Sequence, residues 1–418
     1  MRVAMSIVCL MIILAQFKKN RLLSSSTLWI FIYWVTFAIA PLLTDLYHPY
    51  ADTYAFIGSL GFALGCLLMG NYTLCFGKSR VESRELNVDS TKLIVRVSLI
   101  ASIIALFIYL GSYGIKAVIS GSITTSSLLH SGESAGIGDL FSYCVLIYGF
   151  LIFEMLVANE GKICISFVLH LCIYTALTVL FLFRREYLVI LICMILFYLL
   201  RNKSSLSQMK YIIPAFFGLI FLMFIMVFTR TQGIMGGIKL FTETYNSEVL
   251  KDFMTHFLDI SASYSAFVRE LNVEGMFVNP IVYLKPLFAF IPRSVWPTKP
   301  LSLNVQVLQQ IDYAAYLAGG STGVSILGEG YAVLGKLGIF IYPFVWGILC
   351  KSFDNKYYNH NLINERSLRT VLYLIFSVFM VIECQRGNTQ SAIQDMIIFV
   401  VILWIFEKIN NKRIKFHT

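Results

Sequence analysis

The sequence predicts an all-α membrane protein with many spanning helices, and three observations predict this. Hydrophobic residues make up 58% of the 418 residues, charged residues only 13%, and the mean hydropathy is +0.75. These values exclude a soluble globular domain. Apolar windows that can cross about 30 Å of hydrocarbon give about eleven helices, within a range of about ten to twelve. The net charge of +10 would suggest nucleic-acid binding in a soluble protein, but basic loops on one side of a membrane explain it better.

The expected spans are apolar runs with few charges. They cover residues 3–17, 28–43, 54–76, 93–113, 140–158, 163–183, 187–200, 211–228, 324–349, 370–384 and 393–406. The first run has only Arg2 before it and several cations after it, which is the wrong polarity for a cleaved signal peptide. We therefore expect this run to be the first span.

The loops between these spans differ in charge from one side to the other. Basic residues gather in alternate loops and in the C-terminal tail, at 18–21, 78–92, 162, 201–210, 351–369 and 408–415. The positive-inside rule places these loops in the cytoplasm, so the N-terminus is predicted outside and the C-terminus inside. Arg184 and Arg185 are the exception, because they fall at the outer end of a span. They indicate an anion site, or they reach lipid headgroups, or one helix is miscounted; all three interpretations stay open.

The chain divides into three parts. An N-terminal bundle (1–228) is followed by a large outer segment (229–323), and then by C-terminal helices with a basic tail (324–418). Within the outer segment, 249–271 has apolar residues at helical spacing, which predicts amphipathic helices on the bundle. The apolar run 280–290 is too short to span, which suits a re-entrant or interfacial element.

The run 291–300 holds three prolines together with Arg293, Trp296 and Lys299. It cannot form a lipid-spanning helix, because proline removes backbone donors and buried charge is costly. A stiff segment that holds two cations at a fixed spacing suits recognition of an anion. Trp296 could stack on a sugar or anchor the segment at the membrane interface, and we slightly favour the anchor.

Further outer clusters also carry arginine. They are Arg184-Arg185-Glu186-Tyr187, Thr229-Arg230-Thr231-Gln232-Gly233 and Gln385-Arg386-Gly387-Asn388. Several converging arginines could grip a pyrophosphate in a two-pronged fashion without a metal, and no D-x-D, H-E-x-x-H or C-x-x-C pattern indicates one. For Arg269, which is next to Glu270, we expect a salt bridge within the large segment instead. Glu383 and Asp395 are expected as ion-pair partners of Arg386.

Glu329 lies near the outer end of the span 324–349, after the small-residue run 319–323. Small residues allow a helix or a glycan to approach the backbone closely. An ionisable group within a span is a candidate functional residue, although a structural tie to an arginine or to a helix N-terminus remains equally open.

Together these features resemble the Wzy O-antigen (oligosaccharide repeat-unit) polymerases. The resemblance rests on the run Pro292-Arg293-x-x-Trp296-Pro297-x-Lys299-Pro300, with looser matches at Gly328-Glu329-Gly330-Tyr331, Arg184-Arg185 and Arg386-Gly387-Asn388. It covers most of the chain in topology.

The resemblance implies a membrane glycosyltransferase of the GT-C type, without metal or cofactor, in the bacterial inner membrane. It would transfer a growing glycan from undecaprenyl diphosphate to a new lipid-linked repeat unit at the periplasmic face, with a chain-length regulator protein as a partner to consider. Glu329 would act on the acceptor hydroxyl, with Asp312 and His256 as weaker choices. The cations would stabilise the leaving diphosphate, and Trp296 and Asn388 complete the proposed binding set; the cations are Arg184, Arg185, Arg230, Arg293, Lys299 and Arg386.

Three rival functions stay open. An O-antigen ligase would pass the glycan to lipid A core, but its likeness to the proline-rich run is weaker. A lipid-linked oligosaccharide flippase would line a path across the bilayer with charge, whereas these clusters gather at one face and no internal repeat is evident. A non-catalytic scaffold for other assembly enzymes is the least specific alternative.

Overall fold

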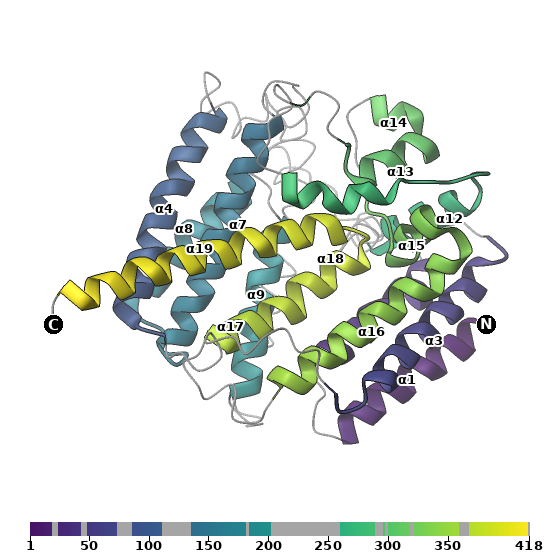
Figure 1. Ribbon diagram of the computed structural model, residues 1–418, viewed down its shortest axis with the longest axis horizontal. Helices are drawn as coiled ribbons and strands as arrows, with labels where there is room; N and C mark the ends of the chain where they lie inside the picture. The colour runs from purple at the N-terminus through teal and green to yellow at the C-terminus, as the bar shows by residue number, and fades with distance from the viewer. Residues whose placement is uncertain are drawn as a thin grey trace, which may run out of the picture. The chain divides into compact units, whose positions relative to one another are not determined.

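The computed structural model describes residues 1–18, 24–42, 48–72, 86–110, 135–180, 184–201, 260–288, 296, 300–317, 322–358 and 368–416. Every regular element in these ranges is helical, which confirms the all-α class for this part of the chain (Figure 1). Ten of the eleven expected spans coincide with helices, and the remaining one, 211–228, lies outside the described ranges. In the described ranges, five helical stretches are long and apolar enough, by length and composition, to cross a membrane: Ser25–Leu42, Ala51–Met69, Val88–Ile108, Phe141–Ala158 and Ile326–Tyr357. The last of them is interrupted at 335–337.

The chain forms two compact units. The described part of the first contains α1 (Arg2–Lys18), α2 (Ser25–Trp34), η1 (Val35–Ile39), η2 (Ala40–Leu42), α3 (Ala51–Met69), α12 (Ile260–Leu271), η5 (Pro280–Phe288), α13 (Leu303–Ile311), α14 (Tyr313–Leu317), α15 (Ile326–Leu334), η6 (Gly335–Leu337), α16 (Gly338–Tyr357), η8 (Phe376–Met380), α18 (Val381–Gln385) and the start of α19 (Thr389–Phe416). The second contains α4 (Val88–Leu110), α7 (Ala135–Ala158), α8 (Ile165–Leu180), α9 (Arg184–Arg201), α17 (Leu368–Ile375) and the rest of α19.

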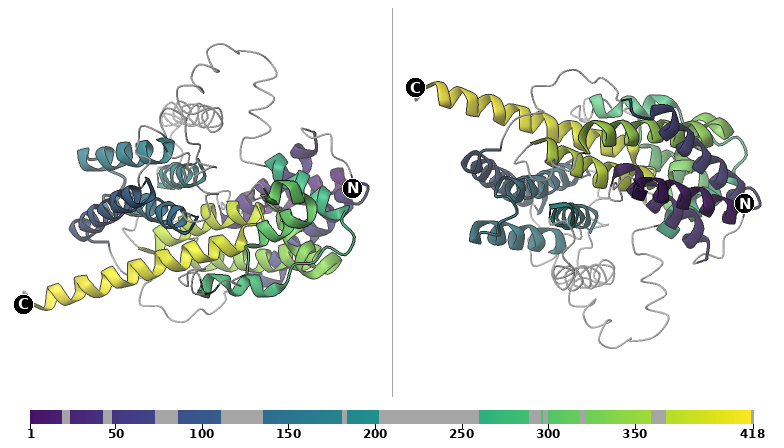
Figure 2. Two further views of the ribbon diagram at one scale, coloured as in Figure 1. Left: turned by 90° about the horizontal axis from the view of Figure 1, so that it is seen from above. Right: turned by 90° about the horizontal axis from the view of Figure 1, so that it is seen from below.

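Helices α3 and α16 form the closest pair in the first unit, and α1 packs on α3 beside them (Figures 1 and 2). Glycine makes this approach possible. A Cβ on Gly61 would stand 2.6 Å from the carbonyl oxygen of Phe340, and one on Gly347 would collide with the carbonyl oxygen of Phe62. Small residues at such positions let two helix backbones touch, as is common between helices in membranes.

A buried carboxylate joins the end of α16 to the start of α2. Asp354 accepts hydrogen bonds from the backbone N–H groups of Ser25 and Ser26, at 2.9 and 3.1 Å, and from both serine hydroxyls. The first turn of a helix leaves N–H groups without partners and favours a negative charge. Asp354 therefore satisfies the start of α2 and fixes it against α16.

The expected single span 324–349 is broken in the structure. Helix α15 ends at Gly335, whose φ of +61° is a left-handed conformation suited to glycine, and α16 begins at Gly338. A Cβ on Gly330 would stand 2.5 Å from the carbonyl oxygen of Gly338. Residues eight apart in one continuous helix would be about 12 Å apart, so the chain turns back on itself here. The sequence prediction missed this break.

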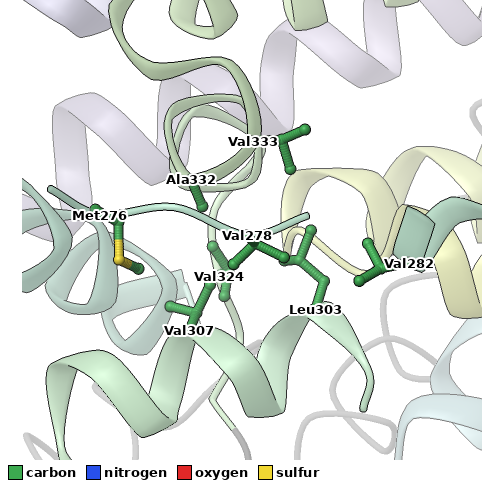
Figure 3. Packing of buried hydrophobic residues seen from close by; sticks show 8 residues of the cluster. All are labelled: Met276, Val278, Val282, Leu303, Val307, Val324, Ala332 and Val333. Carbon is green, nitrogen blue, oxygen red and sulfur yellow. The ribbon is translucent and has the colours of Figure 1, made fainter. Parts of the chain in front are cut away.

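The described part of the segment 229–323 packs on α15 through a small apolar core. Figure 3 shows Val278 between Ala332 of α15 and two residues of α13, Leu303 and Val307, all buried. The Val278 N–H also donates to the Ala332 carbonyl at 2.7 Å. The helices α12 and η5 lie within the predicted ranges 249–271 and 280–290. This core holds η5 beside α15.

The second unit is built on the pairing of α4 with α7. Thr91 of α4 donates to the buried Glu154 of α7 at 3.4 Å, and Tyr148 of α7 meets the Nδ1 atom of His170 of α8 at 2.7 Å. These polar contacts tie neighbouring helices within this unit.

Candidate functional site

Glu329 lies in the first half of α15 and is fully buried. The helix begins at Ser325, whose hydroxyl accepts the N–H of Gly328 at 3.1 Å and caps the first turn. The positive end of the helix dipole favours a carboxylate at this place. Local sequence thus positions an acidic side chain inside the first unit.

Hydroxyl groups donate to both carboxylate oxygens of Glu329. Tyr283 of η5 donates to Oε1 at 2.6 Å, and Thr389 at the start of α19 donates to Oε2 at 2.8 Å. Tyr342 of α16 in turn donates to the Tyr283 hydroxyl at 2.8 Å. Two elements far apart in sequence, η5 and α19, therefore hold this carboxylate in one orientation, and α16 supports the η5 tyrosine.

The turn 386–388 lies against the beginning of α15. Gly387 has a φ of +67°, and a Cβ there would collide with the carbonyl oxygen of Val324, so only glycine fits well. This contact places the expected cluster Arg386-Gly387-Asn388 beside the segment that carries Glu329. The structure thus brings together two of the clusters that the sequence separates.

A second carboxylate belongs to this turn. Glu383 is fully buried; its Oε1 lies 3.9 Å from Nη1 of Arg386, and its Oε2 accepts the Asn388 side-chain amide at 3.2 Å. Asn304 of α13 donates to Asn388 in addition. The expected ion pair between Arg386 and Glu383 is present, and Asn388 is oriented from both sides.

Glu270 of α12 is the third carboxylate, and the sequence analysis did not select it. It is fully buried, and neither of its oxygens has a hydrogen-bond partner within the described ranges. Both oxygens lie 2.6 Å from where a Cβ of Gly328 would be. Burial raises the pKa of Glu270 well above its usual range, and the charge of Glu329 raises it further. Helical spacing could have indicated that Glu270 faces inward, because it is seven residues after Ser263 and three after Phe267, which are both buried.

Tyr283, Tyr342 and Thr389 were also missed. Burial, followed by the charge of Glu329, raises the pKa of the Tyr283 hydroxyl above its usual range. This hydroxyl therefore keeps its proton and remains a hydrogen-bond donor at neutral pH. No sequence motif marks these residues, because their roles follow from contacts across 46 and 60 positions of the chain.

The other predicted residues have separate outcomes. Trp296 is partly buried. Arg269 forms the expected ion pair, with Asp312 at 3.5 Å, and Asp312 also accepts the Ala315 N–H at 3.0 Å. Outside the described part of the chain lie Arg230, His256, Arg293, Lys299 and the side chains of Arg184 and Arg185.

In the ranges that the structure describes, no group of three or more His, Cys, Asp or Glu side chains could hold a metal ion. The three carboxylates Glu270, Glu329 and Glu383 differ in their partners. Glu329 accepts from two hydroxyls, Glu383 lies against the Arg386 turn, and Glu270 has no hydrogen-bond partner in the described part of the chain.

Comparison with known proteins gives one match. No curated protein and no solved structure matches the chain. A family profile described as O-antigen polysaccharide polymerase Wzy matches residues 1–414. Because this match covers nearly the whole length, the chain belongs to the Wzy family of O-antigen polysaccharide polymerases.

Proposed function

We propose that this protein polymerises oligosaccharide repeat units linked to undecaprenyl diphosphate, at the periplasmic face of the bacterial inner membrane. The growing glycan is transferred from its lipid diphosphate to a hydroxyl of the incoming unit. Family membership supports the polymerase activity, and the oriented, buried carboxylate of Glu329 supports this site for it.

The reaction needs one group that accepts a proton and other groups that stabilise the negative charge on the leaving diphosphate. The acceptor hydroxyl gives its proton to Glu329 while its oxygen forms a bond to the anomeric carbon. The bond from that carbon to the diphosphate breaks, and its electron pair leaves with the diphosphate. Tyr283 and Thr389 keep Glu329 in the orientation that this transfer requires.

The proposed cation set stabilises the charge that develops on the diphosphate. Arg386 belongs to it by position, because its turn packs on the segment that carries Glu329. Arg293, the second proposed catalytic residue, and the binding residues Arg184, Arg185, Arg230 and Lys299 are assigned from the sequence alone. Trp296 and Asn388 are proposed to contact the glycan. No metal takes part in this proposal, because guanidinium groups can grip a diphosphate directly.

The architecture that goes with this function is likewise proposed. We infer a GT-C-like bundle of about eleven spans, with the N-terminus in the periplasm and the C-terminus in the cytoplasm. The segment 229–323 then lies on the periplasmic side, and η5 and α12 within it reach the Glu329 site. A chain-length regulator protein would act on this assembly from outside the site.

Replacement of Glu329 tests the proposal most directly. Purified full-length protein is reconstituted with lipid-linked repeat units, and the products are separated by length. Glu329→Gln is expected to slow chain growth by about 10²- to 10⁴-fold, the usual contribution of a general base. Glu274→Gln is the matched control, because Glu274 is an exposed carboxylate in the same outer segment. Undiminished chain growth in Glu329→Gln would remove it from the mechanism.

A cellular experiment separates the rival functions. If the deleted gene encodes a polymerase, its loss leaves a single repeat unit on lipid A. Loss of a ligase leaves polymer on the carrier lipid. Loss of a flippase traps repeat units in the cytoplasm. A normal ladder of surface polysaccharide would contradict all three functions.

Arg293 is tested through its geometry. Arg293→Lys keeps the positive charge but loses the planar fork that grips two phosphate oxygens. We expect a strong loss of polymerisation at normal membrane insertion. Full-length polymer at normal expression would remove Arg293 from the site.

A further inference from the structure

Glu270 has an unusual environment for a carboxyl group. It is fully buried, and neither oxygen has a hydrogen-bond partner among the residues that the structure describes. A buried ionised carboxylate without a partner is very costly, whereas the neutral acid costs far less. The environment of Glu270 therefore favours the protonated form.

The position of Glu270 connects it to the proposed base. Its two oxygens lie against Gly328, the residue directly before Glu329, at a place where a Cβ would be 2.6 Å from each of them. Any side chain at position 328 would displace Glu270. Glycine at 328 therefore makes room for a second carboxyl next to the Glu329 backbone.

The two carboxyls differ in their donors. Glu329 receives hydrogen bonds from Tyr283 and Thr389 and lies in the first half of a capped helix, all of which favour an anion. Glu270 has none of these donors. Two neighbouring buried carboxylates repel each other strongly, so the proton remains on the one without donors.

We propose that Glu270 is the neutral partner of Glu329, a positioning residue whose bound proton keeps the buried pair at a single negative charge located on Glu329. This inference rests on the proposed role of Glu329 as the base. If Glu270 also ionised, Glu329 would be driven to take up a proton and would lose its ability to accept one from the substrate.

Other ionisable groups near Glu270 do not change this assignment. The elements that pack closely on α12 include η1, η2 and α13, which carry no ionisable side chain, and α15, which carries Glu329 and Tyr331. Arg269 and Arg386 each lie near another carboxylate, at 3.5 Å from Asp312 and 3.9 Å from Glu383. Tyr264 lies on α12 itself, and the Tyr283 hydroxyl donates to Glu329.

The pH dependence of polymerisation tests the proposal. Full-length protein with lipid-linked repeat units should show a rate that rises on the acid side as Glu329 ionises and falls on the alkaline side as Glu270 ionises. In Glu270→Gln the amide cannot ionise, so the profile, scaled to its own maximum, should lose the alkaline fall. Tyr283→Phe is the matched control and should keep that fall, since Glu270 is still present.

Two results would overturn the proposal. An unchanged alkaline fall in Glu270→Gln would give Glu270 a purely structural role, and complete inactivity of a folded variant at every pH would make Glu270 the base itself. If the glutamine variant does not fold, Glu270→Met takes its place, because an apolar side chain of similar length suits a site without hydrogen-bond donors.

A second measurement separates this inference from the proposed function. Infrared difference spectra of the wild type and Glu270→Gln at neutral pH, recorded without substrate, should show the carbonyl band of one protonated carboxyl group lost in the variant. Loss of a carboxylate band instead would show that Glu270 is ionised and would contradict the inference. This result does not depend on whether the protein polymerises lipid-linked units.

Discussion

The Tyr283 hydroxyl donates a hydrogen bond of 2.6 Å to Oε1 of Glu329 and itself accepts one of 2.8 Å from Tyr342. This row of hydroxyls joins η5, in the segment 229–323, to both parts of the broken span. It makes the orientation of the proposed base depend on how η5 packs on α15. Replacement of these hydroxyl groups should therefore slow catalysis more, the closer the hydroxyl lies to Glu329.

Tyr283→Phe should slow polymerisation by about 10- to 150-fold, because a hydrogen bond to a charged group contributes about 1.5–3 kcal/mol. Tyr342→Phe removes only a bond between two hydroxyls and should slow it by about 2- to 10-fold. Rates of chain growth with reconstituted protein measure both effects. An equal or reversed order would show that this row of hydroxyls does not act through Glu329.

Thr389 supports the other oxygen of Glu329, over 2.8 Å. Thr389→Val keeps the shape but removes the hydroxyl, so we expect a loss of about tenfold or more in turnover. Thr389→Ser retains the donor and should recover most of the rate. Turnover is measured in both variants. If Thr389 acts only through packing, the valine variant should be the more active of the two, and this result would contradict the hydrogen bond's role.

Hydrophobic patterning was enough to predict the long apolar helices, because each of them is marked by a continuous apolar run in the sequence. Ten of the expected spans fall on helices, and the short apolar run at 280–290 becomes η5. The break at Gly335 was not predictable from hydropathy, since Gly335 and Lys336 interrupt an otherwise apolar run only briefly. The backbone contact between Gly330 and Gly338 is what shows the turn.

The candidate site was predictable only in part. Glu329 and the Arg386 turn stand out as polar groups near the ends of apolar runs. Tyr283 and Thr389 join them through tertiary contacts that no spacing rule connects. Helical spacing indicates that Glu270 is buried, but not that it lies against Gly328. Glu270 also follows Arg269 directly, which suggested a surface pair, whereas Arg269 pairs with Asp312 and Glu270 faces inward.

Asp354 should matter for stability rather than for catalysis. Asp354→Ala removes a buried acceptor and leaves the N–H groups of Ser25 and Ser26 without it, at a cost of about 2–4 kcal/mol in the free energy of unfolding. The control is Asp52→Ala, because Asp52 is more exposed and its pair with Arg2 should contribute about 0–1 kcal/mol. Thermal unfolding in detergent compares the two. Equal losses would contradict the structural role of Asp354.

The contact between α3 and α16 predicts a steric effect. A Cβ on Gly65 would collide with the carbonyl oxygen of Phe344, which is backbone and cannot move aside alone. Gly65→Ala should therefore lower the unfolding temperature by forcing the two helices apart. Leu64→Ala on the same helix is the control, since Leu64 is 48% exposed and its truncation leaves the contact intact. A variant Gly65→Ala as stable as the wild type would contradict this close approach.

The proton on Glu270 also predicts how stability changes with pH. Its pKa is raised in the folded protein, above the ordinary value of 4.5, so above that pH the folded state binds more protons than the unfolded state. Stability from this group therefore falls as pH rises above 4.5 and continues to fall until the folded pKa is reached, by up to about 1.4 kcal/mol per pH unit. Unfolding temperatures measured between about pH 5 and 8 should drop more in the wild type than in Glu270→Gln, which lacks the titrating group. Parallel curves for the two proteins would mean that Glu270 carries no proton in this range.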